Sequence, residues 1–425
     1  MFPFEYGRLK MNDLKRYTAR WYHLILLITL TAIWGCRGDL QQPVYQYAMD
    51  NPAETGSQFP YLFLDNSGTL YMSWITYIDE DIHALQFATY RENGWSTAQT
   101  VRVATNFFVN WADFPSIVGF DDSPVAVQWL RKVEGGPYAY YVQIGFQDES
   151  TGRWDHIITP HLDGTPTEHG FVSMQPLGPN RVLAMWLDGR ETDGRGHGEY
   201  DDFSKSMTLR SAEVSADGEI VRKRVIDSTV CDCCQTDLAE VNGDYLAVYR
   251  GRTEEEIRDI KISRYSSENG EWSEPKTVHN DGWEIQGCPV NGPRIVTNDN
   301  RVAVIWYTGA EDNTGVKLAR SVDGGETFQE PILIADEGAL GRPDLLMTDD
   351  GTIYVSWMQQ VGSAGHVQLK RIGPDGSLNE AISVGNTSST RRSGFPRIAK
   401  VDNQIIVAWT QTEPLLRVRT AKVEI

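Results

Sequence analysis

Four cysteines carry the sharpest chemical signal in the sequence. Cys231, Cys233 and Cys234 stand in the run CDCC, and Cys288 follows in GCPVNGP. Four thiolates hold Zn²⁺ tetrahedrally, and soft sulfur also suits Cu(I). The Cys-x-Cys-Cys spacing is not the two-residue knuckle of structural zinc sites, and an even number of cysteines in an exported chain favours two disulfides. A zinc or copper site and a reactive thiol centre stay open as alternatives.

Arginines and aspartates in the longer loops form a second set of candidate residues. Planar guanidinium groups suit a carboxylate ligand because each donates two parallel hydrogen bonds. Trp111, in FFVNWAD, would stack on a sugar face or cap a channel. The alternative for each arginine is a structural salt bridge between neighbouring repeats. The candidates are Arg250, Arg258, Arg342 and Arg397 for ligand binding, and Asp113, Asp188 and Asp344 as catalytic carboxylates.

A repeated pattern of strands must position these residues. An apolar run, a polar turn and an alternating strand recur seven times, most clearly in GRPDLLMTDDGTIYVSW at 341–357. A period of two residues is typical of a strand, and the Asp-Asp-Gly between the runs favours a hairpin turn. Each copy ends on an aromatic residue, and these residues recur every 51–63 positions: Trp74, Trp129, Trp186, Tyr249, Trp306, Trp357 and Trp409.

Each repeat continues with a loop, a third strand, a tight turn and a fourth strand. Four antiparallel strands in about 50 residues, repeated radially, predict an all-β fold, a β-propeller. We expect seven blades, with six blades plus an insert as the alternative. The last repeat lacks its outer strand, which residues 43–49 would supply, so that pairing of the N- and C-terminal strands closes the ring and removes exposed edges. Residues 36–425 would then form a single propeller domain.

One turn resembles a known family. The run SVDGGETF at 321–328 matches the Asp-box of the sialidase-like (BNR-repeat) propellers, and CDCC…GCPVNGP is similar to a cysteine motif of bacterial lipoproteins labelled sialidase-like. The resemblance implies that the Asp-box is a structural turn on the face away from the active site. It also implies an acidic-sugar site with three arginines, a tyrosine nucleophile backed by a glutamate, and an aspartate acid/base.

The chain departs from that family in detail. Phe59-Pro60-Tyr61 stands where the family's first arginine is found, and the nearest equivalent motif is Phe395-Pro396-Arg397-Ile398 in the last repeat. No tyrosine–glutamate pair follows from the spacing. The family usually has six blades, which is a further difference.

The N-terminal segment indicates export. Basic residues at positions 10–20 precede an apolar run, Trp21 to Trp34, that is short for a membrane span of roughly 20 residues. We expect residues 1–35 to be a signal peptide of the lipoprotein type, with Cys36 lipidated, although Trp34 departs from the small residue that this motif prefers. An uncleaved signal anchor is the alternative. The lipid would be the chain's only attachment to the membrane, in the periplasm or at the outer membrane.

The charge balance excludes one class of partner. Removing residues 1–35, which hold five basic and two acidic side chains, changes the formal net charge from −19 to −22. A domain of that charge repels phosphate backbones, so we expect no nucleic acid partner. The expected function is an exo-α-sialidase-like glycosidase that acts on or binds an acidic glycan. The alternative is a non-catalytic carbohydrate-binding, protein-binding or metal-bearing module at the cell envelope.

Overall fold

The computed structural model describes residues 46–91, 94–148, 150–194, 203–311 and 313–425. The predicted signal segment 1–35 and Cys36 lie outside these residues. Gln46–Ile425 forms one compact unit. In the described residues helical structure is limited to two 3₁₀ turns, η1 (Phe203–Lys205) and η2 (Arg391–Ser393). The same residues hold no helix with the length and apolar character needed to cross a membrane.

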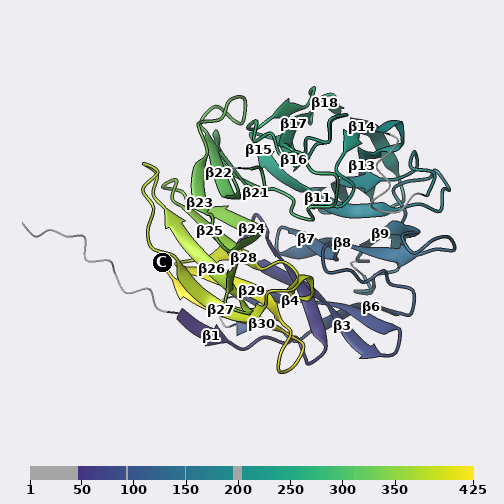
Figure 1. The fold of residues 1–425 in the computed structure, drawn as a ribbon. Coiled ribbons are helices and arrows are strands. Elements are labelled where there is room, and N and C mark those ends of the chain that lie inside the picture. Colours follow the sequence, from purple (N-terminus) through teal and green to yellow (C-terminus); the bar gives the residue numbers. More distant parts are fainter. Residues whose placement is uncertain (1–45, 92–93, 149, 195–202, 312) are drawn as a thin grey trace, which may run out of the picture. The chain divides into compact units, whose positions relative to one another are not determined.

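Seven antiparallel sheets follow one another along the described chain, which confirms the predicted seven-bladed propeller (Figure 1). The strands of the first three blades are, from the inner to the outer edge, β2 (Ser57–Leu64), β3 (Leu70–Asp79), β4 (Ile82–Arg91), β5 (Gly94–Trp95) and β6 (Gln99–Ala104); β7 (Ser116–Phe120), β8 (Ser123–Lys132), β9 (Tyr140–Phe146) and β10 (His156–Ile158); and β11 (His169–Gly178), β12 (Arg181–Asp188), β13 (Met207–Ser215) and β14 (Ile220–Val230).

The next four blades repeat this order. Their strands are β15 (Asp237–Val241), β16 (Asp244–Arg250), β17 (Ile260–Ser266), β18 (Glu271–Trp272) and β19 (Lys276–Thr277); β20 (Arg294–Asn298), β21 (Arg301–Thr308), β22 (Gly315–Ser321) and β23 (Ile332–Ala335); β24 (Ala339–Met347), β25 (Ile353–Val361), β26 (Ala364–Ile372) and β27 (Ile382–Ser388); and β28 (Arg397–Val401), β29 (Gln404–Gln411), β30 (Arg417–Glu424) and β1 (Gln46–Met49).

The first strands of the sheets close into a ring. Each one contacts the first strand of the next blade, in the order β2, β7, β11, β15, β20, β24 and β28, and β28 contacts β2 again. The seventh sheet takes its outer strand from the other end of the chain, because β1 pairs antiparallel with β30 from Gln46 opposite Val423 to Met49 opposite Thr420 (Figure 1, purple beside yellow). This pairing covers the edge that β30 would otherwise expose.

The repeated aromatic residues lie on the second strand of each blade and are buried. Trp74 packs against residues of blade 7, Trp186 against blade 2, and Trp306 against blade 4. Each aromatic side chain therefore fills the space between its own sheet and the preceding one, and burial of such large apolar surfaces is a major source of stability.

Apolar side chains close the channel at the end where the loops lead into the first strands. Three of these strands begin with a bulge, and each bulge holds a non-glycine residue with positive φ: Phe59 (57°), Phe171 (52°) and Arg342 (57°). A bulge re-aims the side chain it carries. Phe59 and Phe171 join one apolar cluster with Phe395, on whose ring Trp111 stacks at 5.7 Å.

The run Ser321–Phe328 forms the turn between the third and fourth strands of blade 5. The Asp323 carboxylate accepts a hydrogen bond from the Ser321 hydroxyl (2.6 Å) and another from the backbone N–H of Thr327 (3.0 Å). Gly324 and Gly325 have φ values of 77° and 89°, which favour glycine. These contacts account for the conformation of the turn.

The pairing of β1 with β30 gives a first prediction. Protein that begins at Asp50 instead of residue 43 should lose about 1–4 kcal/mol of unfolding free energy, because four cross-strand pairs of about 0.2–1 kcal/mol each are removed. It should also self-associate through the exposed edge of β30. Calorimetry and light scattering on the two forms measure both effects. Equal melting temperatures of the two forms would show that the β1–β30 pairing contributes nothing to stability.

Candidate functional site

The channel wall holds a buried ion cluster. Arg294 on β20 donates to Asp237 on β15 (Nη1–Oδ1 2.8 Å) and to Asp344 on β24 (Nε–Oδ1 2.9 Å), so one guanidinium joins three blades. Burial alone would lower the pKa of Arg294, but the two carboxylate charges hold this pKa above its ordinary value. Tyr61 on β2 lies nearby, with its ring centre 6.0 Å from the guanidinium carbon.

Arg397 on β28 is buried, but several of its hydrogen-bond donors lack an acceptor in the part of the chain that the structure describes. Among the described residues its Nε and Nη1 atoms have no hydrogen-bond partner, and Oδ1 of Asp344 lies 3.9 Å from Nη1. Burial, followed by repulsion from Arg294, lowers the pKa of Arg397 to about 10. Three ring centres lie within 5.8 Å of its guanidinium carbon: those of Tyr61, Phe114 and Phe395.

Little free space adjoins these arginines on the loop side. A cavity of about 30 Å³, lined by Asp113, Gln235, Arg294 and Arg397 among others, has room for about one water molecule. Farther along the first strands a wider hollow of about 390 Å³ is lined by Arg294 but not by Arg397. The apolar cluster at the channel mouth therefore occupies the position where a sugar pocket was expected.

Two arginines predicted to bind a ligand instead connect neighbouring blades. The Arg250 guanidinium donates to the carbonyl oxygens of Arg258 (2.5 Å), Asn291 (2.7 Å) and Tyr307 (2.7 Å). The Arg342 guanidinium donates to the Ser393 hydroxyl (2.7 Å) and to the Gly394 and Thr390 carbonyls, and it lies 5.1 Å from the ring centre of Trp111. These contacts join blade 4 to blade 5 and blade 6 to blade 7.

Asp113 lies between blades 2 and 3. Its Oδ1 atom accepts the Phe171 N–H (2.9 Å), and its Oδ2 atom lies 3.3 Å from the Tyr140 hydroxyl. Tyr140 also donates to Glu168 at 2.6 Å, and burial raises the pKa of Tyr140 well above its ordinary value. A second hydrogen-bonded pair of this type, Tyr265 with Glu213, lies in blades 3 and 4. A tyrosine–glutamate pair therefore does not by itself mark an active site in this chain.

Asp188 lies at the end of β12, away from the other two candidate carboxylates. It is fully buried and accepts two hydrogen bonds from the Arg190 guanidinium, both at 2.7 Å, one from the Arg190 backbone N–H at 3.2 Å, and one from the Trp186 indole at 2.8 Å. Burial opposes ionisation, but these donors hold the pKa of Asp188 below its ordinary value. Beside it the imidazole of His169 is stacked on that of His161, with ring centres 3.8 Å apart.

The group His161, Asp163 and His169 has metal-ligand types but a hydrogen-bond pattern that argues against a metal ion. The three ligand atoms lie within 4.8 Å of one another. However, the Nε2 atom of His161 accepts the Val142 N–H at 3.1 Å, so the proton of a neutral imidazole sits on Nδ1, 3.2 Å from the Asp163 carboxylate. Burial lowers the pKa of His161, which keeps it neutral. We read this group as an ion and hydrogen-bond network that fixes Arg190.

A hollow of about 220 Å³ opens beside this network on the outer part of blade 3. Every charged side chain that lines it, apart from the neutral His161, is cationic: Arg190, Arg210, Lys223 and Arg224. Leu162 and Val225 add exposed apolar surface. Burial, and then repulsion from Arg190, lowers the pKa of Arg210. We call this hollow the blade-3 pocket.

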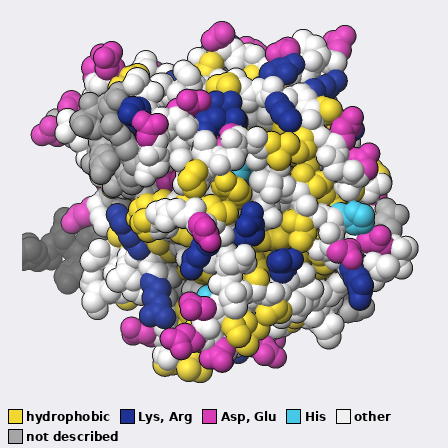
Figure 2. Space-filling view, turned by 90° about the vertical axis from the view of Figure 1, so that its right-hand side faces the viewer, with side chains coloured by type: hydrophobic (Ala, Val, Ile, Leu, Met, Phe, Trp, Pro, Cys, Tyr) yellow, Lys and Arg dark blue, Asp and Glu magenta, His cyan; other side chains and the backbone are white. Residues whose placement is uncertain are grey.

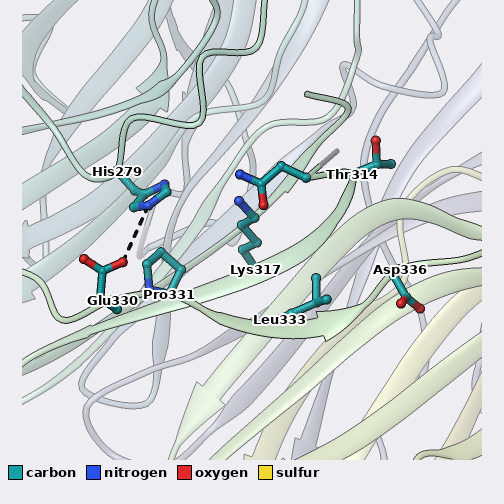
Figure 3. Close-up of a pocket in the computed structure, with 8 residues that line it drawn as sticks. His279, Thr314, Lys317, Glu330, Pro331, Leu333 and Asp336 are labelled. Atoms are coloured by element: carbon teal, nitrogen blue, oxygen red, sulfur yellow. Dashed lines mark ion pairs between the residues drawn. The ribbon is translucent and has the colours of Figure 1, made fainter. Parts of the chain in front are cut away.

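A second hollow, beside blade 5, corresponds to the blade-3 pocket but is lined by side chains of both charges. His279 and Asp281 repeat the His-x-Asp spacing of His161 and Asp163, with Nδ1 of His279 3.0 Å from Asp281. The adjoining hollow of about 580 Å³ is lined by His279, Lys317, Glu330 and Asp336 among others (Figure 3). Nε2 of His279 lies 3.9 Å from Glu330. Equivalent positions of two repeats thus hold a cationic pocket and a mixed one.

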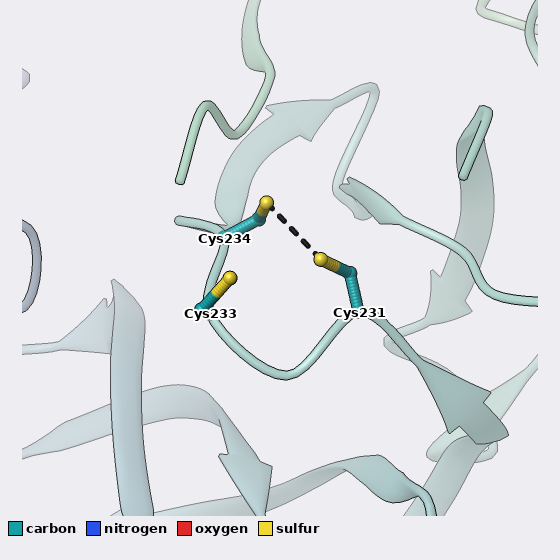
Figure 4. Close-up of side chains that lie close together, drawn as sticks. All are labelled: Cys231, Cys233 and Cys234. Atoms are coloured by element: carbon teal, nitrogen blue, oxygen red, sulfur yellow. Dashed lines mark hydrogen bonds between the residues drawn. The ribbon is translucent and has the colours of Figure 1, made fainter. Parts of the chain in front are cut away.

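The predicted cysteine group does come together. The sulfurs of Cys231, Cys233 and Cys234 all lie within 4.8 Å of one another and point toward a common centre (Figure 4). Cys288, from the loop before β20, is within hydrogen-bonding contact of Cys233. None of the four is disulfide-bonded, and the Cys231 and Cys234 sulfurs are 3.2 Å apart, well beyond a disulfide bond of about 2.05 Å. The two disulfides favoured from the sequence are not formed in the structure.

Charged side chains surround the thiols. Arg258 lies beside Cys231 and forms an ion pair with Glu256 at 2.6 Å, and Arg252 reaches Asp232 at 3.8 Å. Burial would raise the pKa of Cys231, but hydrogen bonds from the other thiols and the arginine charges hold this pKa well below its ordinary value. Burial, with the charge of Cys231, raises the pKa of Asp232 to about 7.

Sequence reasoning missed two sets of residues. Tyr61, Asp237 and Arg294 complete the channel cluster, but nothing in the sequence around them distinguishes them from the other residues of the first strands. The cations of the blade-3 pocket come from the segment after β12 and from β13 and β14. The available signal was the basic run Arg222–Arg224, of which Lys223 and Arg224 line the pocket.

Comparisons with known proteins reach only the fold. No family model and no curated protein matches the chain. Among solved structures it is similar to a protein of unknown function from Dyadobacter fermentans DSM 18053 (13% identity, 89% of this chain and 98% of that chain covered, TM-score 0.47). It is also similar to the NanB sialidase from Streptococcus pneumoniae (12% identity, 90% of this chain and 70% of that chain covered, TM-score 0.44). A third similar structure is Trypanosoma rangeli sialidase (11% identity, 78% of this chain and 56% of that chain covered, TM-score 0.45).

Arg294 gives a prediction for the channel cluster. Arg294→Ala should lower the free energy of unfolding by about 3–5 kcal/mol, because it leaves two buried carboxylates without their cation. Since uncompensated carboxylates gain protons more readily, the difference from the unaltered protein should shrink as the pH falls from 7 toward 4. Denaturant unfolding at several pH values measures both effects. Arg264→Ala, which removes only partly exposed ion pairs, should cost about 1 kcal/mol or less.

Proposed function

We propose that the protein binds an acidic glycan, without cleaving it, in the blade-3 pocket. The observation that carries this proposal is the pocket's lining, to which the described residues contribute four cationic side chains and no carboxylate. Behind the lining Arg224 pairs with Glu271 at 2.5 Å and Arg190 with Asp188 at 2.7 Å, which leaves Lys223 and Arg210 as the cations with the least compensation. Arginine forks suit the planar carboxylate of an acidic sugar, and the exposed Leu162 and Val225 offer apolar contact to the C–H faces of a ring. The volume of about 220 Å³ suits one or two sugar units at an open site.

Arg210 is the arginine of the pocket whose charge a bound anion would compensate most. Its charge is only loosely compensated, by Asp188 at 3.8 Å and Glu191 at 3.4 Å, and the neighbouring Arg190 repels it. Arg190 itself is held in place by its two hydrogen bonds to Asp188. The Arg190 guanidinium is thus fixed in place next to the Arg210 guanidinium, whose charge is less well compensated. This arrangement is preorganised for a ligand carboxylate, and preorganisation raises affinity.

The hydrolase expected from the family resemblance has less support. Asp113, Asp188 and Asp344 each accept hydrogen bonds from neighbouring blade residues, and none of them lines the blade-3 pocket. Hydrolysis requires an acid and a nucleophile or base on either side of the scissile bond. We therefore assign the carboxylates to the structure of the propeller and the arginines of blade 3 to binding.

The setting of this function is the cell envelope. The proposal includes the signal peptide 1–35 and a lipid on Cys36, which are supported by the basic and apolar pattern of the leader. Figure 2 shows one face on which acidic, basic and apolar side chains are interspersed without a continuous basic stripe. Together with the net charge, this favours a local anion site over a nucleic acid partner.

Arg210→Met tests the proposal. It should weaken binding of a glucuronate- or sialate-terminated oligosaccharide by about 10–100-fold, since a charge-assisted hydrogen bond contributes about 1.5–3 kcal/mol. Binding by the unaltered protein should also weaken as salt is added. Isothermal titration calorimetry measures both.

Glu330→Gln in the blade-5 hollow is the matched control and should leave the affinity unchanged. Equal binding of neutral and acidic oligosaccharides, or an unaffected Arg210→Met variant, would overturn the assignment of the site. Release of product from fluorogenic sialosides and glucuronides would overturn the non-catalytic part.

A further inference from the structure

The cysteine cluster is distinct from the blade-3 pocket, and its geometry is built by two loops of neighbouring blades. Gly292 lies directly against the backbone of Gln235, where a Cβ would meet the Gln235 carbonyl oxygen at 2.0 Å. The Gly292 N–H donates to the Gln235 side chain at 3.0 Å. This close approach, available only to glycine, brings the loop with Cys288 against the loop with Cys231, Cys233 and Cys234.

The three sulfurs of the CDCC run form an inner set. They are buried, all lie within 4.8 Å of one another, and point toward a common centre (Figure 4). Cys288 is partly exposed and contacts Cys233 without belonging to the set of mutually close sulfurs. A metal ion bound to three sulfurs at about 2.3 Å would separate them by about 4 Å. That spacing lies within the 4.8 Å limit, and the Cys231 and Cys234 sulfurs, now 3.2 Å apart, would have to move apart by about 0.8 Å.

Charged side chains of both signs surround the sulfurs. Arg252 forms ion pairs with Glu256 at 2.5 Å and with Asp232 at 3.8 Å, and Arg258 forms one with Glu256 at 2.6 Å. The sulfurs are therefore enclosed by a polar network and not by an apolar core.

From these observations we infer that Cys231, Cys233 and Cys234 bind one Cu(I) ion as thiolates, with Cys288 as the outer thiol. Binding releases the thiol protons to solvent and involves no change of oxidation state. Soft thiolates select Cu(I), which accepts three ligands, whereas structural Zn²⁺ sites are almost always four-coordinate. The inner set of three, with the partly exposed Cys288 outside it, therefore favours Cu(I).

The test uses the full chain with Cys36→Ser, so that the four clustered thiols are the only ones. Under anaerobic, reducing conditions Cu(I) is supplied from a chromophoric chelator that competes for it. We expect one equivalent to transfer to the protein and the melting temperature to rise. Cys233→Ser should weaken binding by at least about 100-fold, beyond the 10–100-fold effect typical of a residue that only supports a ligand. Cys288→Ser should keep the stoichiometry and lose less than about 10-fold in affinity.

Other results would overturn the inference. The inference would be wrong if the reduced protein failed to take Cu(I) from the chelator. It would also be wrong if Cu(I) binding were unchanged in each of the single variants Cys231→Ser and Cys233→Ser. Selective binding of Zn²⁺, with equal losses in Cys233→Ser and Cys288→Ser, would replace it with a tetrahedral four-sulfur site. Asp232→Asn, which changes a neighbour and no sulfur, is the control for folding and for indirect effects. It should retain binding within about 10-fold.

Discussion

The closed ring of first strands is the constraint on which every site in this molecule depends. Each first strand contacts two others, and the seventh blade is completed only when β1 pairs with β30. Within that ring, loops far apart in sequence have a single relative placement. The CDCC loop and the Cys288 loop meet because blades 4 and 5 are neighbours, and their contact is as tight as Gly292 against Gln235 allows. A sheet repeat without closure would leave these loops free to separate.

Buried arginines fix the relative position of the blades. Aromatic and aliphatic residues pack together between the sheets, but apolar packing has little directional preference. A guanidinium group is directional, and Arg250, Arg294 and Arg342 each donate to acceptors on a neighbouring blade. Arginine on a loop of a propeller is therefore weak evidence for a ligand. The stronger evidence is an arginine whose charge its own surroundings do not balance, as for Arg210 and Arg397.

The sequence predicts the fold far better than the sites, for a physical reason. Blade number, turn positions and the second-strand aromatics follow from local patterns, since a period of two residues and a glycine turn act within ten residues of chain. Whether Arg250 binds a ligand or a carbonyl depends on Asn291 and Tyr307 in the next blade, which no local pattern records. The cysteines were foreseeable as a group because adjacent loops hold them. Their division into an inner set and an outer thiol depends on side-chain directions that spacing does not determine.

The two His-x-Asp segments show how one scaffold position can serve different purposes. In blades 3 and 5 the histidine and aspartate hold the same local hydrogen bond, and the aspartate is tied to a cation of the next strands, Arg190 or Lys317. The two aspartates of this inner layer are nearly buried, and the histidines and cations around them pack against them. The outer layer differs, since Arg210, Lys223 and Arg224 face one hollow and Glu330 and Asp336 face the other. Because the outer residues are not needed to close the ring, their charge can change without loss of the fold, and binding specificity in this protein is therefore to be sought in that outer layer.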